Sequence, residues 1–222
     1  MVASEVFRGW PADALAFYAE LAADNSKVWW HANKARYDTN VRGPMLALAD
    51  EIRDEFGPLH IFRPHRDTRF AKDKTPYKNH AGGVTEGEGG ASYYVQFGAD
   101  GLYVGAGYYV FAPDQLARYR AAVAGDEGTV FAAAVDAARA AGYAVDGDAL
   151  KTGPRGYAKD HPRVELLRHK GIYAGRQFTP AKWLTTRAAL DRITDAWRGC
   201  PTFLTWLDTR VGPSELPPED RW

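Results

Sequence analysis

The hydrophobic period of the chain changes twice, and this change constrains the fold more than any other feature. Residues 10–56 repeat apolar side chains at helical spacing. Residues 92–97 and 102–111 are instead rich in Tyr, Val and Phe, and residues 98–101 between them (Gly-Ala-Asp-Gly) predict a hairpin connection. Helical spacing returns after residue 113, with one late strand candidate at 172–178. This order predicts an α+β fold, a mostly antiparallel central sheet with N-terminal and C-terminal helices packed on it.

Turn and cap residues place the individual elements. We expect a short strand within 59–63 and a break at Gly43-Pro44 between the second and third helices. Gly105 and Gly107 inside a strand suggest a bulge, or the close approach of another backbone or of a ligand. Helices are expected over 10–25, 25–41, 44–56, 113–124, 127–142, 162–171, 179–199 and 201–211. Residues 1–212 are predicted to form a single α+β domain, followed by a Pro-rich tail at 213–222.

Charge and cysteine content narrow the classes of function. The 28 Lys and Arg balance 28 Asp and Glu, which argues against a general polyanion binder but leaves room for a local basic pocket. Cys200 is the one cysteine, so no internal disulfide forms and a reducing cytoplasm is the expected location. No base lies beside Cys200 in sequence, which favours a buried structural thiol over a nucleophile. No secretory signal and no apolar run of about 18 residues is present, so no membrane partner is expected.

The stretch RDTRFAKDKTPYK, residues 66–78, concentrates positive charge. From residue 63 to residue 78 six Arg or Lys face two acids, Asp67 and Asp73. Arg offers a planar fork for phosphate or carboxylate, and Lys adds a point charge. The first interpretation is an anion pocket into which a second polar segment, residues 151–170, folds back. Its candidate ligand-binding residues are Arg66, Arg69, Lys72, Asp73, Lys74, Tyr77 and Lys78, with Asp160, His161, Arg168 and Lys170 from the second segment.

The same residues also fit an internal ion-pair lattice. Asp67 and Asp73 would pair with nearby cations, Phe70 and Tyr77 would anchor the core, and Thr75-Pro76 would only shape the turn. His161 is expected first as a turn or capping residue and second as a general base. Six histidines without a close pair on one helix face, and one cysteine, predict no metal site.

Four segments resemble a widespread, uncharacterised family of microbial proteins classed as a domain of unknown function. The first is RDTRFAKDKTPYK itself, which resembles the family signature RDxRFxKDKTPYK. The others are WWHANKARYD, GAGYYVFAPDQLARYR and PRGYAKDHPRVELLRHK. The resemblance covers residues 7–210 and is consistent with the α+β prediction, while implying no reaction or cofactor.

Three functions stay open at this point. The first is binding of a small phosphorylated or otherwise anionic metabolite, with or without an enzymatic reaction. The second is a scaffold or protein-interaction domain whose basic motif forms internal ion pairs. The third is a nucleic-acid-binding module, suggested by Arg, Lys and Trp-rich helices and opposed by the zero net charge. The oligomeric state and the cofactors are not indicated by any pattern.

Overall fold

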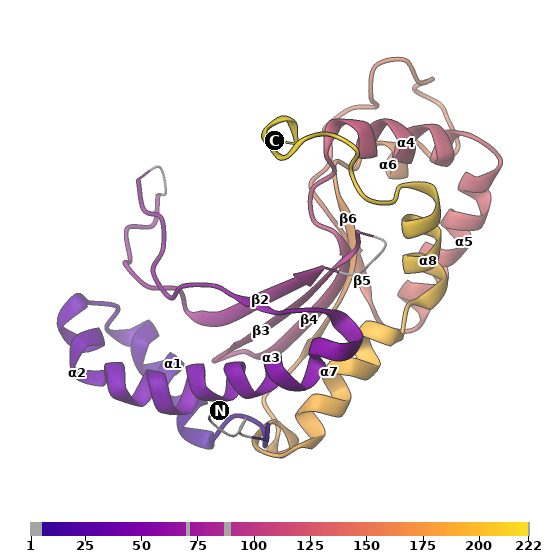
Figure 1. Cartoon of the computed structure of the whole chain (residues 1–222). Coiled ribbons are helices and arrows are strands. Elements are labelled where there is room, and N and C mark those ends of the chain that lie inside the picture. The colour runs from indigo at the N-terminus through magenta and orange to yellow at the C-terminus, as the bar shows by residue number, and fades with distance from the viewer. Residues whose placement is uncertain (1–5, 70–71, 87–89, 222) are drawn as a thin grey trace. The chain divides into compact units, whose positions relative to one another are not determined.

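One sheet organises the chain, and the computed structural model describes it over residues 6–69, 72–86 and 90–221. Among these residues the strands lie in the order β1-β2-β3-β4-β6-β5 (Figure 1). β1 pairs antiparallel with β2, and β5 pairs antiparallel with β6. Their bounds are β1 His60–Ile61, β2 His80–Glu86, β3 Ser92–Gly98, β4 Gly101–Tyr108, β5 Ala144–Asp146 and β6 Ile172–Phe178. The predicted α+β class with a mostly antiparallel sheet is confirmed.

Most helices lie close to the positions that the sequence predicts, but the helix expected over 179–199 covers only Ala188–Arg198, and the one expected over 162–171 covers only Val164–Leu167. Their bounds are α1 Ala12–Ala23, α2 Lys27–Tyr37, α3 Gly43–Phe56, α4 Pro113–Ala124, α5 Glu127–Ala140, α6 Val164–Leu167, α7 Ala188–Arg198 and α8 Pro201–Arg210. Residues Lys182–Thr185 and Pro218–Asp220 form short 3-10 turns. Within the described part of the chain, no helix combines the length and apolar character needed to cross a bilayer.

The expected break at Gly43-Pro44 is wrong. Residues Asp38–Arg42 form a π-helical turn, and the backbone stays helical from α2 through this turn into α3. The amide of Gly43 donates to the carbonyl of Asp38, five residues back. A proline inside an α-helix leaves a carbonyl without its donor and crowds the preceding turn. The wider π turn just before Pro44 accommodates both effects, so the helix continues instead of ending.

The residues group into two compact units that alternate along the chain. The first unit comprises Met1–Thr85, Tyr94–Val104 and Gln177–Asp195. The second comprises Glu86–Tyr93, Gly105–Arg176 and Ala196–Trp222. The boundaries fall inside β2, β3, β4, β6 and α7, so neither unit is one continuous piece of sequence. The single domain over 1–212 stays a prediction.

In the first unit, helices α1, α2 and α3 lie on one side of strands β2, β3 and β4 (Figure 1). Trp10 stacks on Phe97 of β3 with ring centroids 4.5 Å apart, and Tyr18 of α1 meets the same ring at 6.3 Å. Val95 and Phe97 are buried, as are Leu102 and Val104 in β4. Because side chains alternate across a strand, the residues between these core positions point to the opposite face of the sheet.

The second unit has an aromatic core of its own. Phe131 of α5 stacks on Trp206 of α8 at 4.1 Å and on Phe203 at 5.4 Å. Cys200 is buried at the start of α8, as the sequence predicts, and this burial raises the pKa of its thiol to about 11. A thiol with so high a pKa is a poor nucleophile at neutral pH.

The structure settles one feature of the strands that the sequence pattern left open, at Gly107, and adds two strands that the pattern missed. The positive φ of 141° at Gly107 goes with a close approach of β6, since a Cβ there would lie 2.5 Å from the carbonyl oxygen of Ile172. At this position the neighbour is therefore protein backbone. Strand β2, with two glycines and no alternating pattern, was not expected from the sequence, and neither was the short β5.

Candidate functional site

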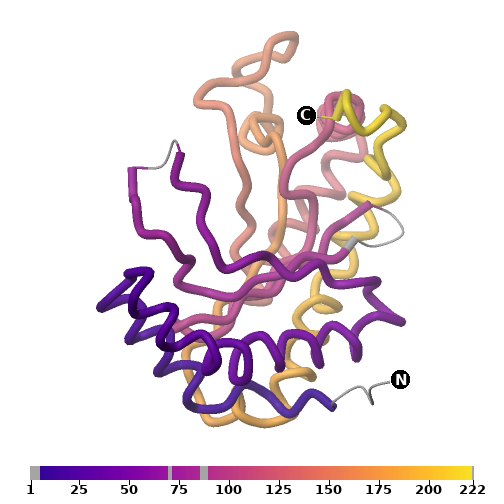
Figure 2. The backbone as a smooth tube through the Cα atoms, turned by 60° about the vertical axis from the view of Figure 1, so that its left-hand side comes forward, coloured from indigo at the N-terminus to yellow at the C-terminus, as the bar shows by residue number. Residues whose placement is uncertain are grey.

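The basic stretch forms a hairpin over residues 64–78, called the basic hairpin below. The amide of Arg66 donates to the carbonyl of Pro76 at 2.9 Å, and the amide of Lys78 donates to that of Pro64 at 2.8 Å. His65 and Tyr77 form an isolated antiparallel bridge between the two limbs. Both limbs leave the strands on the side away from α1 and α3 (Figures 1 and 2). Phe70 lies outside the described residues.

Helix α2 and the loop before it anchor the hairpin base. The Tyr77 ring is 2% exposed and stacks on Trp30 of α2, with centroids 4.1 Å apart and planes 10° from parallel. The side chain of Asn25 binds both backbone groups of Tyr77, donating to its carbonyl at 3.0 Å and accepting from its amide at 3.1 Å. Tyr77 is thus a core anchor, and its ring does not face a ligand.

The two acids of the basic hairpin are paired locally. Arg66 binds the carboxylate of Asp73 and the hydroxyl of Thr75, the latter at 2.7 Å. Arg69 binds both oxygens of Asp67 through its fork, although its side chain is 78% exposed. The hydrogen bonds from Arg69 hold the pKa of Asp67 below its ordinary value. The pKa of Asp73 is also lowered, mainly by the hydrogen bonds from Thr75 and to a smaller extent by Arg66.

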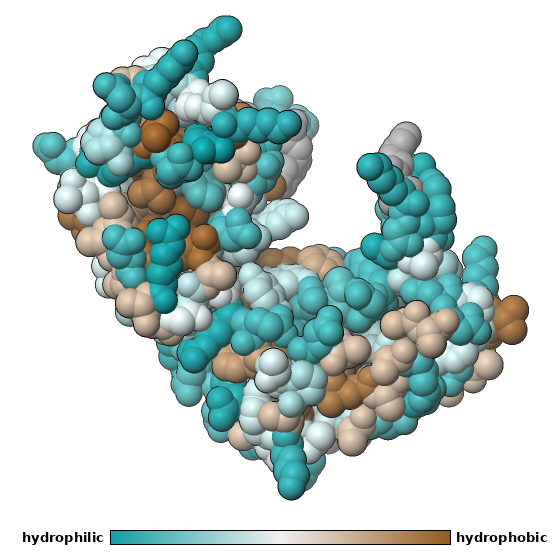
Figure 3. Space-filling model, turned by 180° about the vertical axis from the view of Figure 1, so that it is seen from behind, coloured by the Kyte–Doolittle hydropathy of each residue, from teal (hydrophilic) through white to brown (hydrophobic). Residues whose placement is uncertain are grey.

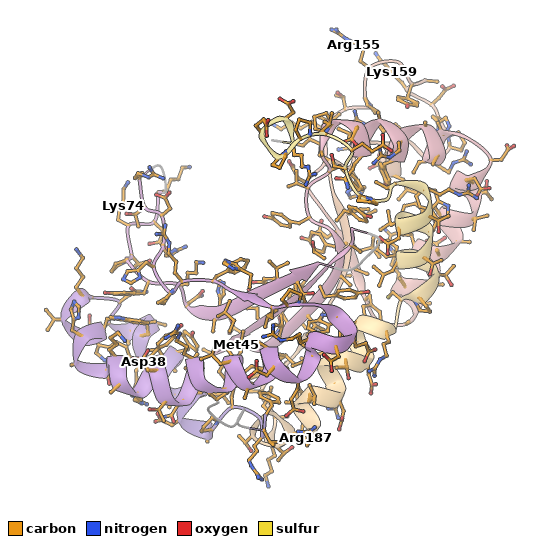
Figure 4. All side chains as sticks on the ribbon, viewed as in Figure 1. Asp38, Met45, Lys74, Arg155, Lys159 and Arg187 are labelled. Atoms are coloured by element: carbon orange, nitrogen blue, oxygen red, sulfur yellow. The ribbon has the colours of Figure 1, made fainter. Side chains whose placement is uncertain are left out.

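The remaining cations of the hairpin are exposed. Lys72 and Lys74 are exposed, and the ammonium of Lys74 reaches the carbonyl of Thr68 at 2.9 Å. Figure 4 shows Lys74 on the far part of the hairpin, away from the helices. In Figure 3 the hairpin is a projecting column of hydrophilic side chains. Its described surface therefore carries more positive than negative charge after the two local pairs form.

The sheet face below the hairpin base, called the open face, is polar and aromatic. It is the face opposite Val95, Phe97 and Leu102. Strands β3 and β4 place Tyr94, Gln96 and Tyr103 on it, all partly exposed. The open face also carries His80 of β2, Gln177 of β6, and Phe62 and Lys78 beside the strands.

A cavity of about 60 Å³ lies at one end of the open face. Its walls are Asn79, His80, Gln96, Tyr103 and Gln177, together with the β3–β4 turn at residues 98–101. This volume is room for several water molecules or for one compact ligand. Imidazole, amide and phenol groups from four strands thus meet at one place, with backbone groups of a glycine-rich turn beside them.

Burial and nearby cations set the protonation of this site. Burial lowers the pKa of His80 below its ordinary value of 6.5, and repulsion from Lys78 and Arg66 lowers it further. The pKa of Lys78 is also lowered, first by burial and then by Arg63. Lys78 lies over the Phe62 ring, 5.0 Å from its centroid. His80 is therefore neutral at pH 7, beside the ammonium of Lys78 and the guanidinium of Arg66, which is paired with Asp73.

The second polar segment belongs to the second unit and is bound into its own surroundings. His161 accepts a hydrogen bond from the amide of Arg163 at 3.0 Å, which is a turn-capping contact. Arg168 donates to the carbonyl of Leu150 at 2.6 Å and pairs with Glu165, and Lys170 pairs with Asp148. Asp160 is exposed in a loop whose tip carries Arg155 and Lys159 (Figure 4). A site shared by the two polar segments stays a prediction.

Comparison with known proteins gives one match. The profile of a family described as conserved hypothetical proteins, DUF2461, matches residues 13–206. The chain belongs to this family. No curated protein and no solved structure matches the chain. Across the described residues of this DUF2461 member, no group of three His, Cys, Asp or Glu side chains lies close enough to hold a metal ion.

Sequence reasoning placed the basic hairpin of this DUF2461 member in a site but missed the open face. Gln96, Tyr103 and Gln177 are scattered over three strands and belong to no motif. The one available signal was the alternation of Tyr94 and Gln96 with buried Val95 and Phe97, which indicates a strand with one polar face. Their meeting with His80 depends on strand order, which a local pattern does not contain.

Proposed function

We propose that this protein binds a small anionic ligand, of the phosphate or carboxylate class, at the cavity around His80 on the open face. The observation that carries the proposal is a neutral, half-buried imidazole in a polar cavity, next to the cations Lys78 and Arg66. Gln96 adds an amide to the same wall, whereas the NH₂ group of Gln177 already donates to the carbonyls of Asp100 and Phe178. A reducing compartment such as the cytoplasm fits the buried thiol of Cys200 and is part of the proposal.

The electrostatics give the proposal its physical content. Burial first, and then repulsion from Lys78 and Arg66, disfavour protonation of the imidazole, which is why the pKa of His80 is low. A bound anion would offset this repulsion and would accept a hydrogen bond from the imidazolium. Binding therefore raises the pKa of His80 and takes up a proton, so the affinity increases as pH falls toward that pKa.

The basic hairpin has a supporting role in this proposal. Arg66 belongs to the hairpin base, where it pairs with Asp73 and its charge also acts on His80, whereas Arg69 pairs with Asp67. The exposed Lys72 and Lys74 raise the local positive potential and increase the encounter rate with anions. In this proposal the base of the hairpin and the sheet contact the ligand, whereas Lys72 and Lys74 only attract anions toward the site.

The test combines binding with protonation. Phosphate, sulfate, sugar phosphates and carboxylates are titrated into the wild type while the His80 ring resonances are followed by NMR. We expect at least one of these anions to raise the pKa of His80, and His80→Asn to weaken its binding about 10-fold. The matched control is His31→Asn, on an exposed position of α2, which should leave binding unchanged. Unchanged His80 resonances with every anion would contradict the proposal.

The ion pairs of the hairpin favour a second candidate, a scaffold or protein-interaction domain. Under this alternative Arg66–Asp73 and Arg69–Asp67 exist to hold the hairpin shape for a protein partner. Small anions would then add no stability to the wild type, and Arg66→Ala would lower the melting temperature with or without phosphate. A melting temperature that rises with one anion, and does so less in Arg66→Ala, favours the first candidate.

A further inference from the structure

The open face carries a row of aromatic rings that the anion proposal does not use. Phe62 and Tyr94 have ring centroids 6.4 Å apart, and Tyr94 and Tyr103 have centroids 6.1 Å apart. All three side chains are only partly buried, unlike Phe97 on the opposite face. Aromatic rings that remain accessible on a sheet face are surfaces on which planar ligands stack, and every nucleobase has such a planar face.

A glycine shapes this row. A Cβ at Gly82 of β2 would lie 3.0 Å from the Tyr94 hydroxyl and 3.5 Å from two of its ring carbons. The Tyr94 ring therefore extends across the neighbouring strand instead of standing upright between side chains. A ring in this position offers a broad surface for a second ring, and a larger residue at position 82 would push it out of place.

Amide groups lie next to the aromatic row. The Tyr94 hydroxyl donates to Oε1 of Gln96 at 2.7 Å, which directs the NH₂ group of that amide elsewhere as a donor. Gln96 and Gln177 both line the cavity that contains His80. The NH₂ group of Gln177 already donates to the carbonyls of Asp100 and Phe178, so the NH₂ group of Gln96 is the amide donor offered to a base edge.

We infer that the anionic ligand is a nucleotide, whose base stacks on the Tyr94 and Phe62 rings while its phosphate lies near His80 and Lys78. This inference rests on the proposed function and names its ligand class. Lys78 joins the two parts of the site, because its ammonium lies 5.0 Å from the Phe62 centroid. The same chemistry is present in a mononucleotide and in a single RNA strand. The zero net charge of the chain favours the mononucleotide.

The experiment compares ligands that differ by one part. Dissociation constants are measured for phosphate, ribose 5-phosphate, AMP, adenosine and a short oligoadenylate. We expect AMP to bind the wild type at least about 10-fold more tightly than ribose 5-phosphate, because only AMP can stack. Tyr94→Leu should remove this difference, whereas Tyr94→Phe should keep it. The control Tyr109→Leu, at a tyrosine that is 75% exposed in the second unit, should also keep it.

The outcomes distinguish failure of the nucleotide inference from failure of the proposed anion binding on which it rests. Equal affinities for AMP and ribose 5-phosphate in the wild type would overturn the nucleotide assignment and leave anion binding standing. Failure of every anion to bind would overturn both. Tight binding of oligoadenylate, with AMP no better than ribose 5-phosphate, would overturn the mononucleotide and point to an RNA strand. If Tyr94→Leu does not fold, Phe62→Leu replaces it and should narrow the gap between AMP and ribose 5-phosphate.

Discussion

At the scale of single residues, Asn25 decides how the basic hairpin leaves the helices. Its amide binds both the N–H and the C=O of Tyr77, 52 residues away, as a partner strand would. Both backbone groups are part-buried, and a part-buried polar group that loses its partner costs free energy. Asn25 therefore fixes the hairpin base, and with it the cations beside His80.

Asn25→Ala should lower the free energy of unfolding by about 2 kcal/mol, because the two backbone groups of Tyr77 lose their partner. Urea unfolding measures this loss, and hydrogen exchange at the Tyr77 amide should become faster. The control is Asn33→Ala, which removes a single side-chain bond to the carbonyl of Trp29 and should cost less. Equal stabilities of the two variants would show that the hydrogen bonds between the Asn25 side chain and the backbone of Tyr77 do not stabilise the fold.

At the scale of secondary-structure elements, Arg163 joins the end of α4 to the start of α5. Its guanidinium donates to the carbonyls of Val123 at 2.7 Å, Ala124 at 3.0 Å and Gly125 at 2.8 Å. These carbonyls lie at the end of α4, where no further turn of the same helix follows to bind them, and that of Gly125 also accepts from the amide of Gly128. Gly128 makes room for the contact, since a Cβ there would lie 2.6 Å from the guanidinium.

Arg163→Ala should lower the free energy of unfolding by about 2 kcal/mol, since charge-assisted bonds to several helix-end carbonyls are lost together. Arg163→Lys should recover only part of this, because an ammonium does not span the carbonyls as the planar fork does. Urea denaturation followed by circular dichroism gives the values. Arg139→Ala is the control, at an exposed pair with Asp136, and should change stability by no more than about 0.5 kcal/mol. A loss at Arg163 as small as the loss at Arg139 would refute this capping role.

At the scale of the whole molecule, ionisation couples stability to pH in two steps. Burial holds the pKa values of His80 and His169 below the ordinary 6.5. Ion pairs hold the pKa values of acids such as Asp13 and Glu51 below theirs, with Arg36 and Arg187 as the partners. In every case the unfolded chain binds protons more readily than the folded one, so stability rises with pH through each transition.

We expect the free energy of unfolding to change little between about pH 7 and pH 8 and to fall first as pH drops below about 6.5, where unfolded histidines become protonated. A second decline should begin below about 4.5, where the acids lose their ion pairs. Urea unfolding across this pH range measures both steps. The double variant His80→Asn/His169→Asn should lose the upper step and keep the lower one. An upper step that survives in the double variant would place its origin in other groups.

The sequence by itself determined the elements whose limits and type depend on residues that are neighbours in the chain. Pro11 and Pro113 lie at or near helix starts, and the glycine-bounded turn at residues 98–101 joins β3 to β4. The period of the apolar residues therefore predicted the α+β class and most helices, and the lack of a neighbouring base predicted the burial of Cys200. The basic hairpin was also visible as a cluster of charge, since its members are neighbours in the chain.

Only the tertiary structure decided the rest. Strand β2 has no pattern of its own and becomes a strand by pairing with its neighbours in the sheet. The hairpin cations pair with acids at distances that composition does not reveal, and Tyr77 turned out to be held by a residue 52 positions away. His80, Gln96, Tyr103 and Gln177 meet because four strands lie in one order. Local sequence sets backbone preference and the apolar face of each element, whereas non-local pairing, burial and charge decide which side chains meet.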